Sequence, residues 1–377
     1  MGANIGNFGN FALEEAASAL EDNTATAVDV REVDSDGARR LAAALAGNRM
    51  VESLAIRGKP GMDVEQICAA LARNDSIAAF HLSGTQLDTR SAELLAAALA
   101  ENSSVTSLNL AGNGIDFEGT KLLVAVSAMN GRIASLNLSG NSLGVTGAEC
   151  LAAALLQNNT MTSLDLAGGK IGTQGAKSLA AALARNKTVT SLGLAGNEFG
   201  AEGAKHLALA LAENGCVTTL DLSRNNIGTA GAEHLAAGLV QNSSLTSLDL
   251  CHNMIDFQGA EFLAEALEEN CSIKSLELTG AYKRIAAALE RNKMGSLVLT
   301  ATCESREFKK WVIMCTTIGG SQAARVEIEP TETMACLKSA VIAQTAHPGS
   351  LLLVRPDATR LCDLRSQIGD SFAADEA

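Results

Sequence analysis

Apolar residues recur along this chain in a fixed unit, in which a Leu-x-Leu pair is followed by a polar turn and then by an amphipathic segment. Seven successive pairs lie 28 residues apart, at Leu108/Leu110, Leu136/Leu138, Leu164/Leu166, Leu192/Leu194, Leu220/Leu222, Leu248/Leu250 and Leu276/Leu278. A constant period of this length indicates a solenoid, in which each layer buries its apolar face against the next.

The period becomes irregular at both ends of the array. Upstream it slips at Phe80/Leu82, Leu54/Ile56 and Val28/Val30, and downstream it ends in a shortened unit at Leu297/Leu299. Irregular terminal units are typical of the caps that close a solenoid. We therefore predict an N-terminal cap over residues 1–23 and about nine full repeats within residues 24–302.

Each unit predicts a short strand with one buried face. Within residues 105–113, apolar Leu108 and Leu110 alternate with polar Ser107 and Asn109. This alternation is the pattern of a half-buried strand, and strands at a constant period without hairpin turns are parallel.

An asparagine follows the strand in most units. It is present as Asn113, Asn141, Asn197, Asn225 and Asn253, a set that we name the asparagine ladder. A side-chain amide at this position can bond the backbone of neighbouring turns. The ladder departs at Lys59, Thr85 and Gly169, where the turns must close differently or bind water.

The amphipathic part of the unit predicts a helix. Between residues 147 and 158, four apolar residues recur on one helical face. They are Ala148, Leu151, Ala152 and Leu155. The unit ends in Asn158, and we predict that this residue stops the helix in the left-handed conformation.

The unit VTSLNLAGNGI…EGTKLL…N resembles the ribonuclease-inhibitor-like subclass of leucine-rich repeats, over about residues 24 to 300. That subclass also forms the sensing arms of NOD-like receptors and the body of Ran GTPase-activating proteins. The resemblance implies an α/β horseshoe with parallel strands on the concave face and helices on the convex face. It implies a binding surface without naming its partner. No P-loop precedes the repeats, so the nucleotide-driven switch of a NOD-like receptor is not expected.

The repeat signature stops near residue 303, and three of the four prolines lie beyond it. A change of composition predicts a domain boundary. Residues 311–317 and 323–329 predict a hairpin, Thr331 begins a predicted helix that ends at Pro348, and residues 351–354 and 359–361 predict two extended pieces.

This order of elements resembles a small α+β ubiquitin-like (β-grasp) unit, which we predict over residues 303–377. Two features depart from that family, because the last strand and the terminal Gly-Gly needed for conjugation are missing. The exposed edge of the hairpin must then be covered by the solenoid, by residues near 294–301, or by another chain.

Composition and charge narrow the class of partner. Aromatic residues make up only 3% of the chain, which suits many small layers rather than one irregular core. The net charge is −13 and the isoelectric point is about 4.9. Such a charge repels nucleic acid and anionic lipid, so we expect a protein partner with a basic surface.

Cysteines and apolar runs indicate the compartment. The nine cysteines are scattered and lack CxxC spacing, so neither a disulfide framework nor a zinc site is predicted. No apolar run reaches the roughly 18 residues of a membrane span, and the N-terminus lacks a secretory signal. We expect the cytoplasm, with the nucleus as the alternative.

The strand positions suggest a binding site on the concave face. Parallel strands lie about 4.8 Å apart, so equivalent residues of successive units form a column. The predicted partner-binding residues are Asn109, Asn137, Asp165, Asp221, Asp249 and Glu277. Stacked carboxylates raise one another's pKa or attract a cationic partner. The alternative is that ordinary solvated carboxylates simply recur at this position.

Other chemistry is not indicated. His206 and His234 are equivalent helix residues, with Cys150 two units before His206, but repeat helices lie about 10 Å apart, too far for a shared zinc. Cys251 and His252 are adjacent and point to opposite faces. Motifs such as GxSxG and HExxH are absent. We predict no metal, no cofactor and no catalytic residue.

The sequence therefore favours a non-enzymatic protein-interaction scaffold, with ubiquitin-related or immune-like signalling as a context. One alternative is a GTPase-activating protein of the Ran activator type, for which Arg57 and Arg224 are candidate groups. Another is an inhibitor of a basic enzyme such as a ribonuclease, which the acidic column would attract.

Overall fold

The structure is a computed structural model of the chain. It describes residues 10–279, 284–286, 288–289, 296–306, 311–317, 322–328 and 350–354. The chain divides into two compact units, Met1–Tyr282 and Lys283–Ala377. None of the helices in these described ranges is long and apolar enough to cross a membrane.

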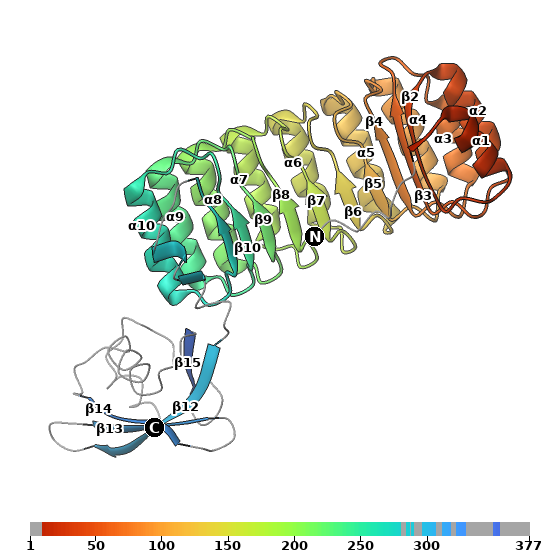
Figure 1. The fold of residues 1–377 in the computed structure, drawn as a ribbon. Coiled ribbons are helices and arrows are strands. Elements are labelled where there is room, and N and C mark those ends of the chain that lie inside the picture. The colour runs from red at the N-terminus through yellow and green to blue at the C-terminus, as the bar shows by residue number, and fades with distance from the viewer. Residues whose placement is uncertain are drawn as a thin grey trace. The chain divides into compact units, whose positions relative to one another are not determined.

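The first unit is built on one open parallel sheet of 11 strands that follow one another in chain order (Figure 1). The strands are β1 (Asn10–Phe11), β2 (Ala27–Val33), β3 (Ser53–Gly58), β4 (Ala79–Ser83), β5 (Ser107–Asn109), β6 (Ser135–Asn137), β7 (Ser163–Asp165), β8 (Ser191–Gly193), β9 (Thr219–Asp221), β10 (Ser247–Asp249) and β11 (Ser275–Glu277). A parallel sheet in chain order requires a return segment after every strand.

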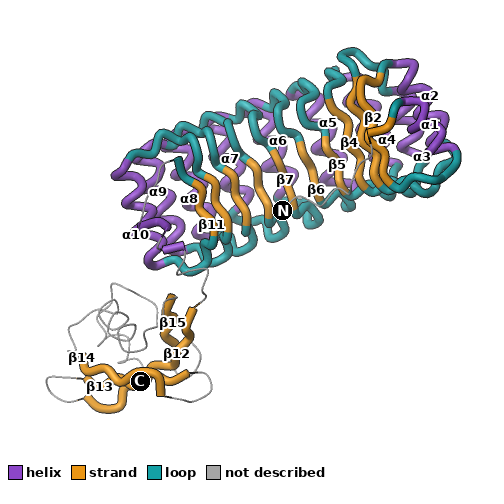
Figure 2. The backbone as a smooth tube through the Cα atoms, viewed as in Figure 1, coloured by secondary structure: helices purple, strands orange, loops and turns teal. Residues whose placement is uncertain are grey.

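Helices supply these return segments and lie along one side of the sheet (Figure 2). They are α1 (Leu13–Glu21), α2 (Ser35–Leu45), α3 (Glu65–Arg73), α4 (Thr89–Glu101), α5 (Phe117–Asn130), α6 (Gly144–Leu155), α7 (Gly172–Leu183), α8 (Gly200–Glu213), α9 (Gly228–Gln241) and α10 (Phe257–Glu269). The predicted α/β solenoid of alternating parallel strands and helices is confirmed.

The core lies between the sheet and the helices, and it is built from the periodic apolar residues. Leu108 pairs with Leu136 in register, and both are buried. In α6 the four residues predicted to face inward, Ala148, Leu151, Ala152 and Leu155, are all buried. Each layer therefore covers the apolar face of the next, as the period predicts.

The asparagine ladder is buried and bonds adjacent turns. Asn225 is fully buried; its Nδ2 donates to the carbonyls of Leu194 at 2.8 Å and Leu222 at 3.0 Å, and its Oδ1 accepts from the amide of Asn197 at 2.8 Å. The side chain thus satisfies backbone groups that water does not reach, as expected from its spacing.

The turns without a ladder asparagine close through direct hydrogen bonds. Thr85 donates its amide and hydroxyl to Asn113 Oδ1, at 3.0 and 2.8 Å. The Lys59 amide donates to the Val33 carbonyl at 2.8 Å, and the Gly169 amide donates to the Leu166 carbonyl at 3.2 Å. These three turns therefore close through other hydrogen bonds within the protein, which is the first of the two expectations for them.

The prediction that the asparagine ending the unit, such as Asn158, adopts the left-handed conformation is wrong. Asn102, which caps α4, is extended at φ −70° and ψ 135°, and Asn158 has no positive φ. Asn102 Nδ2 donates to Leu71 and Asn74 carbonyls of the preceding repeat, while its Oδ1 accepts from the amides of Ser104 and Val105. At the end of α4 itself, the Leu99 carbonyl accepts a hydrogen bond from Asn130 Nδ2 of the next repeat, so a left-handed backbone turn is not needed there.

The second unit contains a sheet of 4 strands in the order β14-β13-β12-β15. They are β12 (Ser296–Arg306), β13 (Trp311–Thr317), β14 (Gln322–Ile328) and β15 (Ser350–Val354). β13 and β14 are antiparallel, so the predicted hairpin is confirmed, and β15 covers the predicted extended piece at 351–354. The predicted helix from Thr331 and the piece at 359–361 lie outside the described residues.

One periodic pair belongs to this second sheet. Leu297 and Leu299 lie in β12, which pairs parallel to β15 and antiparallel to β13. They are therefore not a shortened final layer of the solenoid, which was the expectation. β12 instead covers one edge of the hairpin, the second of the three expected ways to cover it.

Candidate functional site

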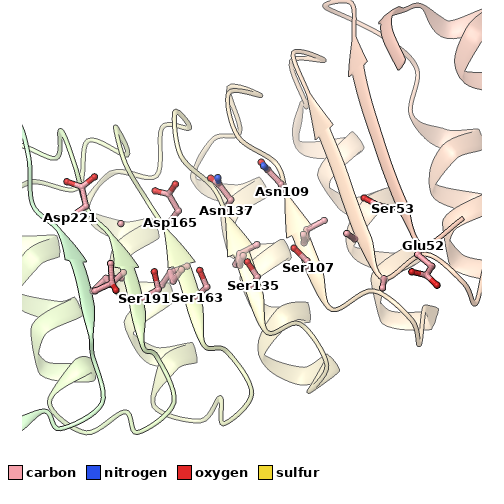
Figure 3. Close-up of a pocket in the computed structure, with 18 of the residues that line it drawn as sticks. Glu52, Ser53, Ser107, Asn109, Ser135, Asn137, Ser163, Asp165, Ser191 and Asp221 are labelled. Atoms are coloured by element: carbon pink, nitrogen blue, oxygen red, sulfur yellow. The ribbon is translucent and has the colours of Figure 1, made fainter. Parts of the chain in front are cut away.

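The exposed face of the parallel sheet, the predicted concave face, presents parallel rows of small polar side chains (Figure 3). One row, the serine row, consists of Ser53, Ala79, Ser107, Ser135, Ser163, Ser191, Thr219, Ser247 and Ser275. The second, the column, runs through Asp29, Ala55, His81, Asn109, Asn137, Asp165, Gly193, Asp221, Asp249 and Glu277. All six predicted binding residues therefore lie in one column, in strand register.

A groove of about 630 Å³ runs over these rows from β2 to β9. Its lining includes Asn109, Asn137, Asp165 and Asp221 of the column, together with the serine row from Ser53 to Thr219. Figure 3 shows the column residues and the serines as two lines of side chains that cross successive strands. A surface of this kind offers hydrogen-bond donors and acceptors with few bulky anchors.

The asparagines and aspartates of the column from Asn109 to Asp249 also have a structural task at the end of their strand. Oδ1 of Asn109, Asp165, Asp221 and Asp249 each accepts the amide two residues later, at 3.0, 3.0, 2.9 and 2.8 Å. This bond closes an Asx turn, which favours asparagine or aspartate over other residues. The turn explains why these two residue types recur, which supports part of the alternative interpretation.

The Asx turn does not fix the charge of the column. Asparagine and aspartate supply the same Oδ1 acceptor, and the chain uses asparagine at 109 and 137 but aspartate at 165, 221 and 249. The second oxygen of each aspartate is not needed for the turn. The acidity of the C-terminal half of the column is therefore additional to what the fold requires.

Asp165 is the carboxylate of the predicted binding residues whose pKa is shifted. Burial raises the pKa of its carboxyl, the amide of Ala167 lowers it, and the charge of Asp221 raises it. Its carboxylate lies over Gly193, where an added Cβ would be 2.6 Å from Asp165 Oδ1. Glycine at 193 therefore makes room for the carboxylate, which crosses toward Asp221.

The other residues singled out in the sequence do not form a site. His206 and His234 are half-buried on α8 and α9, and Cys150 lies on α6. Cys251 is half-buried, whereas His252 is exposed in a turn at φ 59°. Within the ranges that the structure describes, no cluster of three or more His, Cys, Asp or Glu side chains could hold a metal ion.

The two candidate arginines lie far apart in the array. Arg57 ends β3 on the exposed face, and its Nη2 is 3.8 Å from Asp29 Oδ2. Arg224 is exposed in the turn after β9 at φ 58°. The solenoid does not bring them together.

A charged group at the N-terminal end of the column was not among the predicted binding residues. Asp29 is only 4% exposed, and Arg31 and Arg57 both approach it. The irregular pair Val28/Val30 already placed Asp29 in the column, so extending the register through the slipped units would have found it. Its burial and its second arginine depend on the packing of β2 against β3.

Sequence comparison identifies the repeats. A family model described as "Leucine Rich repeat" matches residues 101–124, 134–152, 157–180, 185–208, 213–236 and 241–264. These segments cover the regular central part of the solenoid. No curated protein matches the sequence of the chain.

Solved structures are similar in fold. The leucine-rich repeat-containing protein LegL7 from Legionella pneumophila has a TM-score of 0.52 at 22% identity, covering 75% of this chain and 97% of that one. The structure of the Rad7 and Elc1 complex in yeast gives 0.50 at 15% identity, covering 71% and 67%. At these identities the likeness concerns the fold alone, which agrees with the parallel strands and helices described above.

Proposed function

We propose that this leucine-rich-repeat solenoid is a non-enzymatic scaffold that binds a protein partner on the concave face. The observation that carries the proposal is the in-register column from Asn109 to Glu277 beside a groove of about 630 Å³. A continuous, exposed, polar surface on a rigid array suits an extended partner surface. The fold itself requires the Asx acceptors but not the negative charges.

The chemistry of the column indicates the partner. Asp221, Asp249 and Glu277 occupy consecutive register positions, on strands that lie about 4.8 Å apart along the sheet. Repeated negative charges at this spacing favour lysine and arginine side chains and accelerate association with a basic surface. The serine row adds hydrogen bonds alongside. We infer a basic protein segment that lies across β7 to β11.

The length of the unit supports membership of the ribonuclease-inhibitor-like subclass, because each regular layer has 28 residues and a full helix. The hairpin of β13 and β14 supports, as a proposal, a ubiquitin-like second unit that makes a separate contact. A combination of this kind fits ubiquitin-related or immune-like signalling. An inhibitor of a basic enzyme is the second candidate, and the acidic half of the column favours it.

The experiment compares partners captured by the intact chain and by the triple variant Asp221→Asn/Asp249→Asn/Glu277→Gln. The aspartate substitutions keep the Asx acceptors, so the fold is preserved while the charge is removed. We expect the affinity for the recovered partner to fall about tenfold, and the loss to be greater at about 50 mM than at about 300 mM salt.

The matched control is Glu93→Gln/Glu149→Gln/Glu233→Gln, which removes the same charge from exposed helix positions. It should bind as the intact chain does. If both triple variants keep the same partners with the same affinity, the column is not the binding surface. If a recovered basic enzyme also loses activity on binding, the inhibitor function is favoured over a passive scaffold.

A further inference from the structure

Strands β2 and β3 carry a cluster of one carboxylate and two arginines at the opposite end of the sheet from the acidic C-terminal half of the column. Asp29 lies on β2, and its Oδ2 is 3.7 Å from Arg31 Nη2 and 3.8 Å from Arg57 Nη2. The side chain of Asp29 is 6% exposed, whereas those of Arg31 and Arg57 are 51% and 48% exposed. A buried carboxylate thus holds two half-exposed guanidinium groups on the concave face.

A backbone irregularity accompanies this cluster. Val30 pairs with Ile56 and Val33 pairs with Gly58, so β2 contains one more residue than β3 over this stretch. The extra length is taken up at Glu32, which has a φ of 56°. Bulges and left-handed non-glycine residues cost free energy and recur at functional sites, where they redirect a side chain. Here the bulge directly follows Arg31.

The fold does not need an acid at this position. Equivalent column positions hold Ala55 and Gly193 without disturbing the sheet. Moreover, Asp29 Oδ1 is buried and has no hydrogen-bond partner in the described part of the chain. A buried, incompletely bonded carboxylate destabilises the fold. The negative charge of Asp29 keeps the positive charges of Arg31 and Arg57 close together, although these two would otherwise repel each other.

The two guanidinium groups have unused hydrogen-bonding capacity. Within the described residues, neither one donates a hydrogen bond, and their contact with Asp29 is longer than a hydrogen bond. With Asp29 the cluster carries one net positive charge. Residues at the same strand position in other layers are small, such as Ser83, Ser139 and Ser223. The pair is therefore a basic site in a small-residue surface, beside His81 of the column.

We propose that Arg31 and Arg57 form a carboxylate-binding site for an acidic residue of the protein partner, with Asp29 as the positioning residue. The inference rests on the proposed function and adds the orientation in which the partner binds along the solenoid. Two adjacent guanidinium groups match a carboxylate through paired N–H donors. The chain's net charge of −13 disfavours a long polyanion such as nucleic acid, whereas a short acidic segment of a protein partner is compatible.

The partner is thereby oriented along the solenoid. Its acidic residue binds at β2 and β3, and its basic residues bind from β7 onward. Five strand spacings separate β2 from β7, which is about 24 Å. A partner segment with opposite charges at this separation binds in one direction only, because the reversed direction places like charges together.

The test uses a fluorescently labelled hexaglutamate peptide as the probe, with hexaglutamine as its uncharged counterpart. Anisotropy at low salt measures binding to the full chain, to Arg31→Gln/Arg57→Gln, and to Arg132→Gln/Arg185→Gln. The last variant removes the same charge from two exposed arginines elsewhere. We expect the Arg31→Gln/Arg57→Gln variant to bind hexaglutamate at least about fivefold more weakly, and the control variant to bind as the intact chain does.

Three results would overturn the proposal: no binding of hexaglutamate to the intact chain, equal weakening in both variants, or equal binding of hexaglutamine. Removing both arginines leaves Asp29 buried without a cation, which can unfold the first layers. The triple variant Asp29→Asn/Arg31→Gln/Arg57→Gln removes that charge and should fold and still fail to bind. The probe contains no basic residue, so this result is independent of the test of Asp221, Asp249 and Glu277.

Discussion

At the scale of single residues, two asparagines per regular layer satisfy buried backbone groups that would otherwise be unpaired. Asn225 bonds the turns that follow the strands, and Asn214 bonds the ends of the helices, where its Nδ2 donates to the carbonyls of Leu183 and Asn186. Both are buried. Because each one links its own layer to the preceding one, these side chains couple neighbouring repeats in addition to closing a turn.

Asp165 provides a prediction about pH. Its pKa is raised by burial and by Asp221, so the folded state holds the proton more tightly than the unfolded state does. Stability therefore falls as the pH rises from the ordinary aspartate value of 3.8 through the raised folded pKa, and the full penalty persists at neutral pH. Asp165→Asn keeps the Asx acceptor and removes this penalty. We expect the variant to be more stable than the intact chain at neutral pH.

Urea unfolding of both proteins at pH values of about 7 and about 4.5 measures this difference. The increase in the urea midpoint of Asp165→Asn over the intact chain should be smaller at the lower pH, where Asp165 is increasingly protonated in the folded state. Asp116→Asn, an exposed N-cap whose Oδ1 accepts from Gly119, is a control that should show no such gain. A gain that is equal at both pH values, or a loss at neutral pH, would contradict the argument.

At the scale of elements, helix α9 packs against the backbone of α8 at Gly238. An added Cβ there would lie 2.5 Å from the carbonyl oxygen of Ala208. The neighbouring layers carry alanine at this position, as Ala210 and Ala266, both of which are buried. Glycine is therefore a consequence of local helix spacing rather than of the repeat itself.

We expect Gly238→Ala to destabilise the protein by about 1 kcal/mol, although alanine favours helices. The intrinsic helix preference gains roughly 1 kcal/mol, whereas forcing apart a backbone contact costs about 1–3 kcal/mol. Chemical unfolding measures the net change in the free energy of unfolding. Gly47→Ala is the matched control, because nothing lies within 4 Å of its added Cβ. An unchanged or raised stability of Gly238→Ala would show that α8 and α9 separate without cost.

At the scale of the whole molecule, the regular layers of the first unit contact their immediate neighbours through equivalent interactions. The hydrogen bonds of Asn197 and Asn225 join residues 28 positions apart, and the strands pair with the same offset. Energetics of this kind are those of a one-dimensional array. Removing one complete layer should then preserve every remaining interface.

We expect deletion of Thr173–Gly200, one complete layer of 28 residues, to leave a folded solenoid with a slightly lower Tm, since Gly172 then precedes Ala201 as Gly200 does now. Deletion of residues 173–186 removes α7 and keeps β8, so the core faces of α6 and α8 lose their cover. This shorter deletion should abolish cooperative melting. Circular dichroism during heating compares the two, and equal stability of both variants would refute a layered architecture.

The sequence determined the layers of this protein, because every layer repeats the same local pattern and meets a copy of itself. Leu108 and Leu110 faced the core, the asparagine ladder was buried, and the column from Asn109 to Glu277 aligned in register as its spacing predicts. Because equivalent residues are a constant number of positions apart, the period alone predicts which residues of adjacent layers are neighbours.

Only the tertiary structure decided the features that break the period. The extended backbone of Asn102, the burial of Asp29 beside Arg31 and Arg57, and the membership of Leu297 in the second sheet each depend on a contact with a particular neighbour. The same holds for the close approach at Gly238. The local pattern specifies which residues are buried. The distance to the neighbouring groups and the charge of those groups are set by the packing of segments that lie outside the regular spacing.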